Sequence, residues 1–168
     1  NGWEPIGGSG GQDNFTGSFD GQGHIIKDLY INRSDENQVG LFGFLEGTPK
    51  IKNLGAVNVN ITGSMDVGGI VGAFYGEGGS LENSLVTGYI NSIGDPDSRV
   101  GGITGRTDAD VTLKNCYFKG TIDASDPMIG GIVGRNDYAK ITDCYSVPDM
   151  DADVKEIGGI VGSQEPNG

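Results

Sequence analysis

The sequence predicts an all-β solenoid, a fold in which short repeats stack on one another. One phrase occurs five times: VGLFG from Val39, VGGIVG from Val67, VGGITG from Val100, and IGGIVG from both Ile129 and Ile157. The copies start 28, 33, 29 and 28 residues apart, and a period of roughly 20–50 residues is typical of solenoids. The apolar segments between turns are only about 3–6 residues long and rich in Val, Ile, Tyr and Phe, which favours strands over helices.

The elements follow in a fixed order along the chain. We expect residues 1–23 to form an N-terminal cap or an incomplete first coil, and residues 24–168 to form the repeats of the same single domain. A second phrase keeps step with the first, in copies that start at Ile26, Ile51, Leu81, Leu113 and Ile141. A looser run follows each copy, such as Val57–Ile61 and Val86–Ile90. The prediction is therefore about five to six coils of three short strands each.

The glycine phrase predicts where each coil bends. Val67 and Ile70 are three residues apart and would face opposite ways in a regular strand, so a bulge or sharp bend at the Gly-Gly pair is needed to turn both inward. The inward column is then Leu41, Ile70, Ile103, Ile132 and Ile160. Glycine is 32 of the 168 residues, which we ascribe to corners that need a positive φ.

The second phrase predicts two further columns. The third residue of each copy is polar, and these residues are Asp28, Asn53, Asn83, Asn115 and Asp143. They form either a hydrogen-bonded side-chain ladder along the stack or simply a set of residues that suit a turn. The next column places Cys116 and Cys144 in adjacent coils, where they are either two small buried hydrophobes or a disulfide between coils.

The net charge of −12 limits the classes of molecule that the chain is expected to bind. A chain this acidic repels nucleic acid and anionic lipid surfaces, so neither is expected as a partner. The sequence contains no long apolar run that would insert into a membrane. We expect a monomer and a piece of a longer protein.

The repeat also resembles a known family. Gly40-Leu41-Phe42-Gly43 and its variants GIVG and GITG are similar to the GLUG repeat of large bacterial surface and secreted proteins, and the resemblance runs from Trp3 to Gly162. Such arrays occur in adhesins and upstream of the catalytic domain of immunoglobulin-A-specific metallopeptidases. The resemblance implies a right-handed parallel β-helix on the outside of a bacterium, with no catalytic residues in the repeats themselves.

Little in the sequence points to catalysis. A zinc peptidase needs three protein ligands and an open position, whereas this chain has one histidine, His24, which we expect in a turn. We therefore predict no enzyme, and any protease activity would lie outside this chain. Asp108 and Asp110 are the nearest candidate acid pair for polysaccharide cleavage, but the equivalent corner one coil later holds only Asp137.

Acidic residues gather in the loops before each glycine phrase. They are Asp35, Glu36, Asp66, Asp95, Asp97, Asp123, Asp126, Asp149, Asp151, Asp153 and Glu156. These loops share one position in the repeat, so they form either a solvated edge or a site for a hard cation such as Ca²⁺. The calcium candidates are Asp149, Asp151 and Asp153, although the segment lacks the Gly and Glu of an EF-hand loop. No other cofactor is expected.

The sequence thus predicts a non-catalytic extracellular or cell-surface module, either a rigid spacer or an adhesive surface for a host protein or glycan. It also fits an accessory region of an immunoglobulin-A peptidase-like protein. The alternative is a carbohydrate-binding or polysaccharide-cleaving β-helix. A row of Tyr30, Phe44, Tyr75 and Tyr138 on one outer face would favour sugar binding, and scattered rings would favour a spacer.

Overall fold

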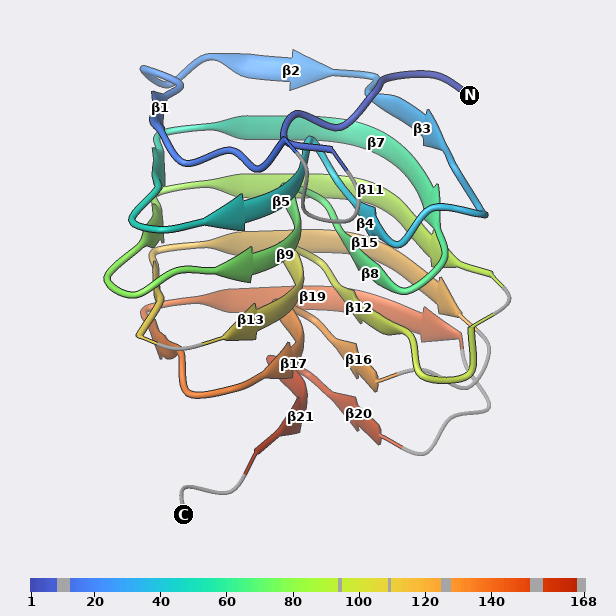
Figure 1. The fold of residues 1–168 in the computed structure, drawn as a ribbon. Helices are drawn as coiled ribbons and strands as arrows, with labels where there is room; N and C mark the ends of the chain where they lie inside the picture. Colours follow the sequence, from blue (N-terminus) through green and yellow to red (C-terminus); the bar gives the residue numbers. More distant parts are fainter. Residues whose placement is uncertain (9–12, 94, 109, 125–127, 152–155, 166–168) are drawn as a thin grey trace.

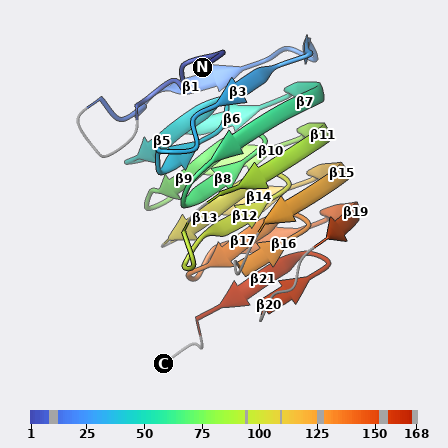
Figure 2. The ribbon, with the colours of Figure 1, turned by 90° about the vertical axis from the view of Figure 1, so that its right-hand side faces the viewer.

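The computed structural model describes residues 1–8, 13–93, 95–108, 110–124, 128–151 and 156–165. In this described part the chain forms 21 β-strands and no α-helix. The strands form four sheets, and the strands within each sheet are parallel. The chain passes through the sheets in about five stacked turns (Figures 1 and 2). The predicted all-β solenoid is confirmed. With no helix among the described residues, none is available that could cross a membrane.

Each sheet takes one strand from each turn, with one exception in the second sheet. The first sheet contains β1 (Ser18–Asp20), β6 (Lys50–Lys52), β10 (Ser80–Glu82), β14 (Thr112–Lys114) and β18 (Lys140–Thr142). The second contains β2 (Ile25–Lys27), β3 (Tyr30–Asn32), β7 (Gly55–Gly63), β11 (Leu85–Ser92), β15 (Tyr117–Ala124) and β19 (Tyr145–Asp151). In this sheet, β2 and β3 of the first turn both pair with β7. The third contains β4 (Gln38–Val39), β8 (Asp66–Gly68), β12 (Arg99–Gly101), β16 (Met128–Gly130) and β20 (Glu156–Gly158). The fourth contains β5 (Phe42–Glu46), β9 (Val71–Tyr75), β13 (Thr104–Asp108), β17 (Val133–Asn136) and β21 (Val161–Gln164).

A complete turn therefore has four strands, and the expected count of three is wrong. The reason lies in the glycine phrase, which was counted as one strand. The bend predicted at its Gly-Gly pair is present, and it is sharp enough to end β8 at Gly68 and begin β9 at Val71 in a different sheet. The backbone pairing continues through the bend, where the Ile70 N–H donates to the Ile103 carbonyl at 3.0 Å.

The glycines in these bends are required by close contact between turns, and not by a positive φ. Gly69, Gly102 and Gly131 are absent from the residues with positive φ. A Cβ on Gly102 would lie 2.2 Å from the Phe118 ring and 2.3 Å from the Gly131 carbonyl oxygen. No room remains for a side chain, so the explanation from positive φ is wrong for this phrase.

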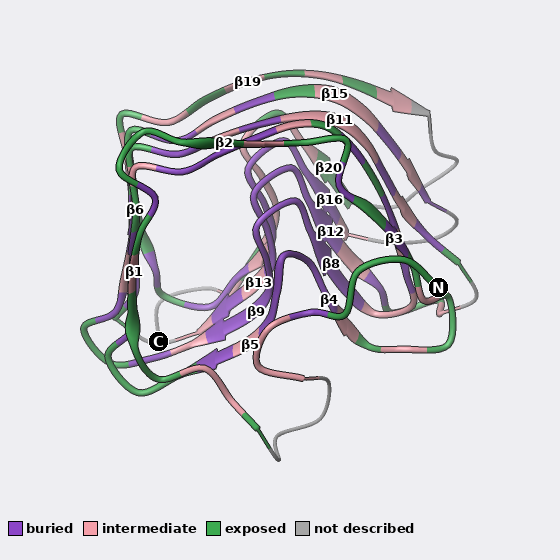
Figure 3. Cartoon of the chain, turned by 90° about the horizontal axis from the view of Figure 1, so that it is seen from above, coloured by how far each residue is buried: buried purple, intermediate pink, exposed green. Residues whose placement is uncertain are grey.

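The interior is a continuous stack of apolar columns. Of the predicted inward column, Leu41, Ile70, Ile103 and Ile132 are buried, and Ile160 in the last turn is partly buried. Seen from above, the chain follows a closed path, and buried residues concentrate along β8, β12 and β16 and the bends beside them (Figure 3). Equivalent residues of successive turns lie one inter-strand spacing apart and are buried against one another. Each turn therefore has the same kind of core as its neighbours.

Both interpretations of the Asn column hold. Asn83 adopts a left-handed conformation, with φ of 50°, and Asn53 and Asn115 do likewise at 55° and 52°. Their side chains also form a ladder. Asn115 Nδ2 donates to Asn83 Oδ1 at 3.0 Å, and Asn83 Nδ2 donates to Asn53 Oδ1 at 3.2 Å.

The ladder ends on Asp20 and not on the predicted Asp28. Asn53 Nδ2 donates to Asp20 Oδ1 at 2.9 Å, and this hydrogen bond lowers the pKa of the Asp20 carboxyl. Asp28 instead accepts from Asn58 Nδ2 at 2.6 Å. The cause is the register of the first turn, in which β1 pairs with β6 whereas β2 pairs with β7. β1 thus lies within the segment that was expected as a cap or incomplete first coil.

Candidate functional site

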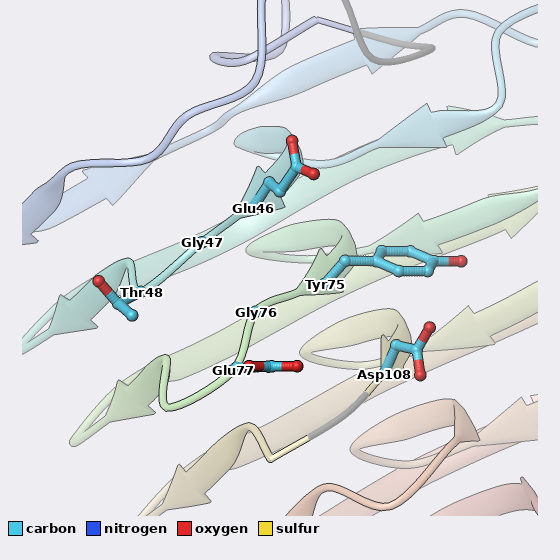
Figure 4. Close-up of a pocket in the computed structure, with 7 residues that line it drawn as sticks. All are labelled: Glu46, Gly47, Thr48, Tyr75, Gly76, Glu77 and Asp108. Atoms are coloured by element: carbon cyan, nitrogen blue, oxygen red, sulfur yellow. The ribbon is translucent and has the colours of Figure 1, made fainter.

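A hollow lies on the outer side of the fourth sheet. It has a volume of about 460 Å³ and is lined by Glu46, Gly47, Thr48, Tyr75, Gly76, Glu77 and Asp108. Register pairs Glu46 with Tyr75 and Tyr75 with Asp108, so successive turns place these three side chains in one row. Figure 4 shows Glu46, Tyr75 and Asp108 projecting from the ends of neighbouring strands.

The Tyr75 ring in this hollow is flanked by two other side chains. Phe44 from β5 stacks on it, with ring centroids 5.0 Å apart and an interplanar angle of 27°. The guanidinium of Arg106 from β13 lies 5.0 Å from the ring centroid. Burial raises the pKa of the Tyr75 hydroxyl. Because β5 and β13 lie on opposite sides of β9, the ring faces are used within the fold and are poor platforms for a sugar.

Two of the three acids that line the hollow, Glu46 and Asp108, already have partners. Asn14 Nδ2 donates to Glu46 Oε2 at 2.6 Å, and Arg106 lies 4.0 Å from Asp108 Oδ2. An acidic rim of this kind attracts cations in general terms. However, the contacts of Glu46 and Asp108 with Asn14 and Arg106 also hold neighbouring parts of the solenoid together.

A charged network continues down the same sheet. The buried Asp137 accepts from Arg106 Nη2 at 2.7 Å and from Arg135 Nε at 2.8 Å. Arg135 also pairs with Glu165 on the next turn. The hydrogen bond to Asp137 raises the pKa of the Arg135 guanidinium. These pairs link three successive turns and hold the Asp137 carboxylate within the fold.

The four aromatic residues proposed as a row do not form one. Phe44 and Tyr75 stack on the fourth sheet, as described above. Tyr30 lies on β3 in the second sheet, and Tyr138 lies in the turn between β17 and β18, where it is 52% exposed. The structure therefore brings two of the four together.

The calcium candidates are only partly described. Asp149 is exposed on β19, paired in register with Thr121, and Asp151 ends that strand. Asp153 lies outside the described residues. Among the residues that the structure describes, no group of three His, Cys, Asp or Glu side chains is arranged to hold a metal. Calcium binding at Asp149, Asp151 and Asp153 stays a prediction.

One residue of the acidic edge is not solvated. Asp66 is 2% exposed and accepts from Arg99 Nη1 at 2.7 Å across β8 and β12. Burial raises the pKa of its carboxyl, although Arg99 acts in the opposite direction. Loop position alone did not reveal that this acid belongs to a paired strand. Of the other polar candidates, His24 is exposed beside the turn before β2, as expected, and Asp110 is exposed.

Cys116 and Cys144 stack in adjacent turns as free thiols. Cys144 Sγ accepts a hydrogen bond from the Cys116 N–H at 3.4 Å. A hydrogen bond from the Cys116 side chain lowers the pKa of the Cys144 thiol to about 7, whereas the same contact and burial raise the pKa of Cys116. The pair occupies the predicted column.

Sequence reasoning missed an aromatic pair that directly follows these cysteines. Tyr117 and Tyr145 have ring centroids 4.4 Å apart. Tyr145 is 60% exposed. Both occupy the position immediately after the cysteine column, so extending the repeat comparison by one residue would have found them.

Comparison with known proteins finds one motif family and two sequence relatives. The model of the GLUG motif matches residues 127–147. Halomucin from Haloquadratum walsbyi is 39% identical over 113 residues, which are 67% of this chain and 1% of that protein. A candidate Gly-rich membrane protein from Evansella cellulosilytica is 37% identical over 78 residues, 45% of this chain and 9% of that protein.

A solved structure extends the comparison to nearly the whole chain. The crystal structure of a candidate immunoglobulin A1 protease from Bacteroides ovatus superimposes with a TM-score of 0.76 at 24% identity. It covers 97% of this chain and 51% of that one. The chain is therefore a β-solenoid that carries a GLUG motif.

Proposed function

We propose that this chain is a non-catalytic, rigid spacer module of a surface or secreted protein, located outside the cell. The in-register stacking of four parallel sheets carries the proposal. Each turn buries its apolar columns against the next, so further turns lengthen the module without a new core. The GLUG motif and the names of the similar proteins, halomucin and a membrane protein, support a surface location.

The outer surface supports a structural role over a catalytic one. On the outer side of the fourth sheet Asn14 binds Glu46 and Arg106 pairs with Asp108, and Arg135 binds the buried Asp137. The single histidine leaves a zinc peptidase site without its ligands. Any peptidase activity of a parent protein would then reside in another part of it. If the parent protein adheres to a host protein, the solenoid would serve as the rigid support of the adhesive surface.

Duplication of one turn tests the spacer. Ser80 pairs with Thr112 in register, so residues 80–111 form one turn that can be repeated between Val111 and Thr112 without changing the neighbouring contacts. Three added copies should extend the maximum dimension measured by small-angle X-ray scattering by about 14 Å, at about 4.8 Å per turn. The far-UV circular dichroism should keep its β signature.

The matched control carries a Gly/Ser linker of the same length as the three copies. A flexible linker should raise the radius of gyration, but it should not lengthen the protein by a fixed amount for each added copy. If the duplicated turns behave like the linker, or if the variant unfolds, the proposal of an extendable rigid spacer is wrong.

A further inference from the structure

A second outward column runs beside the Asn ladder, at the corner between the first and second sheets. Strand register defines its members as Ile25, Gly55, Leu85, Tyr117 and Tyr145. Their neighbours Ala56, Val86 and Phe118 are fully buried. Because side chains alternate along a strand, the column faces outward from the same strands that build the core.

The corner is hollowed along its length. One hollow of about 390 Å³ is lined by Asn83, Ser84, Leu85, Asn115, Tyr117 and Tyr145. A second of about 210 Å³ is lined by Gly23, Ile25, Asn53, Leu54, Gly55, Asn83 and Leu85. The two share Asn83 and Leu85, so they form one groove that crosses successive turns. Gly55 contributes no side chain to the column, and Ile25 lies against it.

The two walls of the groove differ in chemistry. On one wall, the Asn83 amide uses one N–H on Asn53 and one oxygen lone pair on Asn115, whereas an Asn side chain has two N–H groups and two lone pairs. Asn83 thus keeps one donor and one acceptor for another partner. On the other wall, Leu85 and the Tyr117–Tyr145 pair present apolar and aromatic surface.

The residues that line the groove carry no charge, although the chain has a net charge of −12. A neutral, extended ligand with hydroxyl groups on its edges and apolar faces matches both walls. The ladder repeats at about 4.8 Å, a spacing similar to the length of one sugar residue in an extended chain. An acidic ligand would be repelled by the charge of the protein.

We propose that this groove binds a neutral linear glycan, which lies along the stack with its hydroxyl groups on the Asn ladder and its sugar faces on Leu85, Tyr117 and Tyr145. This inference goes beyond a spacer, because it gives the module a specific ligand face. It also differs from the row of aromatic residues predicted from the sequence.

Affinity electrophoresis tests the groove, with native gels that contain β-glucan, xylan or mannan, and alginate as the acidic comparison. At least one neutral polysaccharide should retard the intact chain. Tyr145→Ala should weaken that binding at least tenfold, and Asn83→Gly, which keeps the left-handed turn, should weaken it measurably. The matched control is Tyr138→Ala, an exposed tyrosine at another corner, which should bind as the original chain does.

Circular dichroism of each variant separates binding from folding. The proposal is overturned if no neutral polysaccharide retards the chain, if only alginate does, or if Tyr138→Ala binds as weakly as Tyr145→Ala. Because the length measurement on duplicated turns does not depend on ligand binding, failure here leaves the spacer function standing.

Discussion

Substitution of Asn83 by Gly and by Ala separates the two roles of the Asn ladder. Asn83 has a φ of 50° and makes two side-chain hydrogen bonds, at 3.2 Å to Asn53 and at 3.0 Å from Asn115. Gly accepts the left-handed conformation but lacks the amide. Ala lacks the amide and is also strained at a positive φ.

The expected changes in the free energy of unfolding follow from the lost hydrogen bonds and from the strain at a positive φ. The ladder bonds are exposed, so about 0.5 kcal/mol each is reasonable, at the low end for a net hydrogen bond. Asn83→Gly should therefore lower the free energy of unfolding by about 1 kcal/mol. Asn83→Ala should lower it by about 2 kcal/mol or more, since a left-handed residue with a Cβ costs about 1 kcal/mol further.

Urea denaturation followed by far-UV circular dichroism measures both changes, read at a common m-value. Asn91→Ala is the control, because Asn91 lies in β11 and is absent from the residues with positive φ; its effect should be within about 0.5 kcal/mol. If Asn83→Gly matches the original chain, the ladder bonds do not stabilise it. If Gly and Ala give equal losses, the argument from φ is refuted.

Two further predictions concern close contacts and thiol chemistry. Gly102→Ala should destabilise the fold by about 1–3 kcal/mol, because the new Cβ would lie 2.2 Å from the Phe118 ring. Gly159→Ala, the equivalent change in the last turn, has no heavy atom within 4 Å and should be nearly neutral in the same urea assay; equal losses would contradict the packing explanation. Cys144 should react with iodoacetamide with a midpoint near pH 7, because its pKa is lowered to about 7 from 9.0. The pKa of Cys144 is lower in the folded chain than in the unfolded chain. Its contribution to the free energy of unfolding is therefore complete above pH 9 and is lost as the pH falls through 7. Buried Cys116 should stay unreactive, and a midpoint near 9 for Cys144 would show that the thiol contact has no effect.

The repeat predicted which residues share a column, and that part of the fold was accessible from the sequence. The inward isoleucines, the Asn ladder and the stacked cysteines all follow from period alone. The number of strands did not, because period gives no backbone angle at the Gly-Gly bend. The role of Gly102 was missed for a related reason, since contact with Phe118 depends on the opposite sheet.

The candidate sites were less accessible. The phrase at Ile26 resembles the one at Ile51, yet the structure pairs Ile26 with Ala56, so Asp28 was assigned to the wrong column. Tyr145 follows Cys144 directly, and its contact with Tyr117 depends on the register of β15 and β19. Outer-face chemistry depends on such register details, which similarity between short phrases does not resolve.

The corners of the solenoid differ in how much extra chain they accept. The corner of the Asn ladder has only two residues in every turn from β6 onwards, as between Lys52 and Gly55, and the Gly-Gly bend is equally fixed from β8 onwards. By contrast, residues 64–65 join β7 to β8, whereas residues 93–98 make the same connection between β11 and β12. New peptide segments grafted at this variable corner would be displayed at regular intervals along one edge, while the glycan groove and the glycine contacts remain undisturbed.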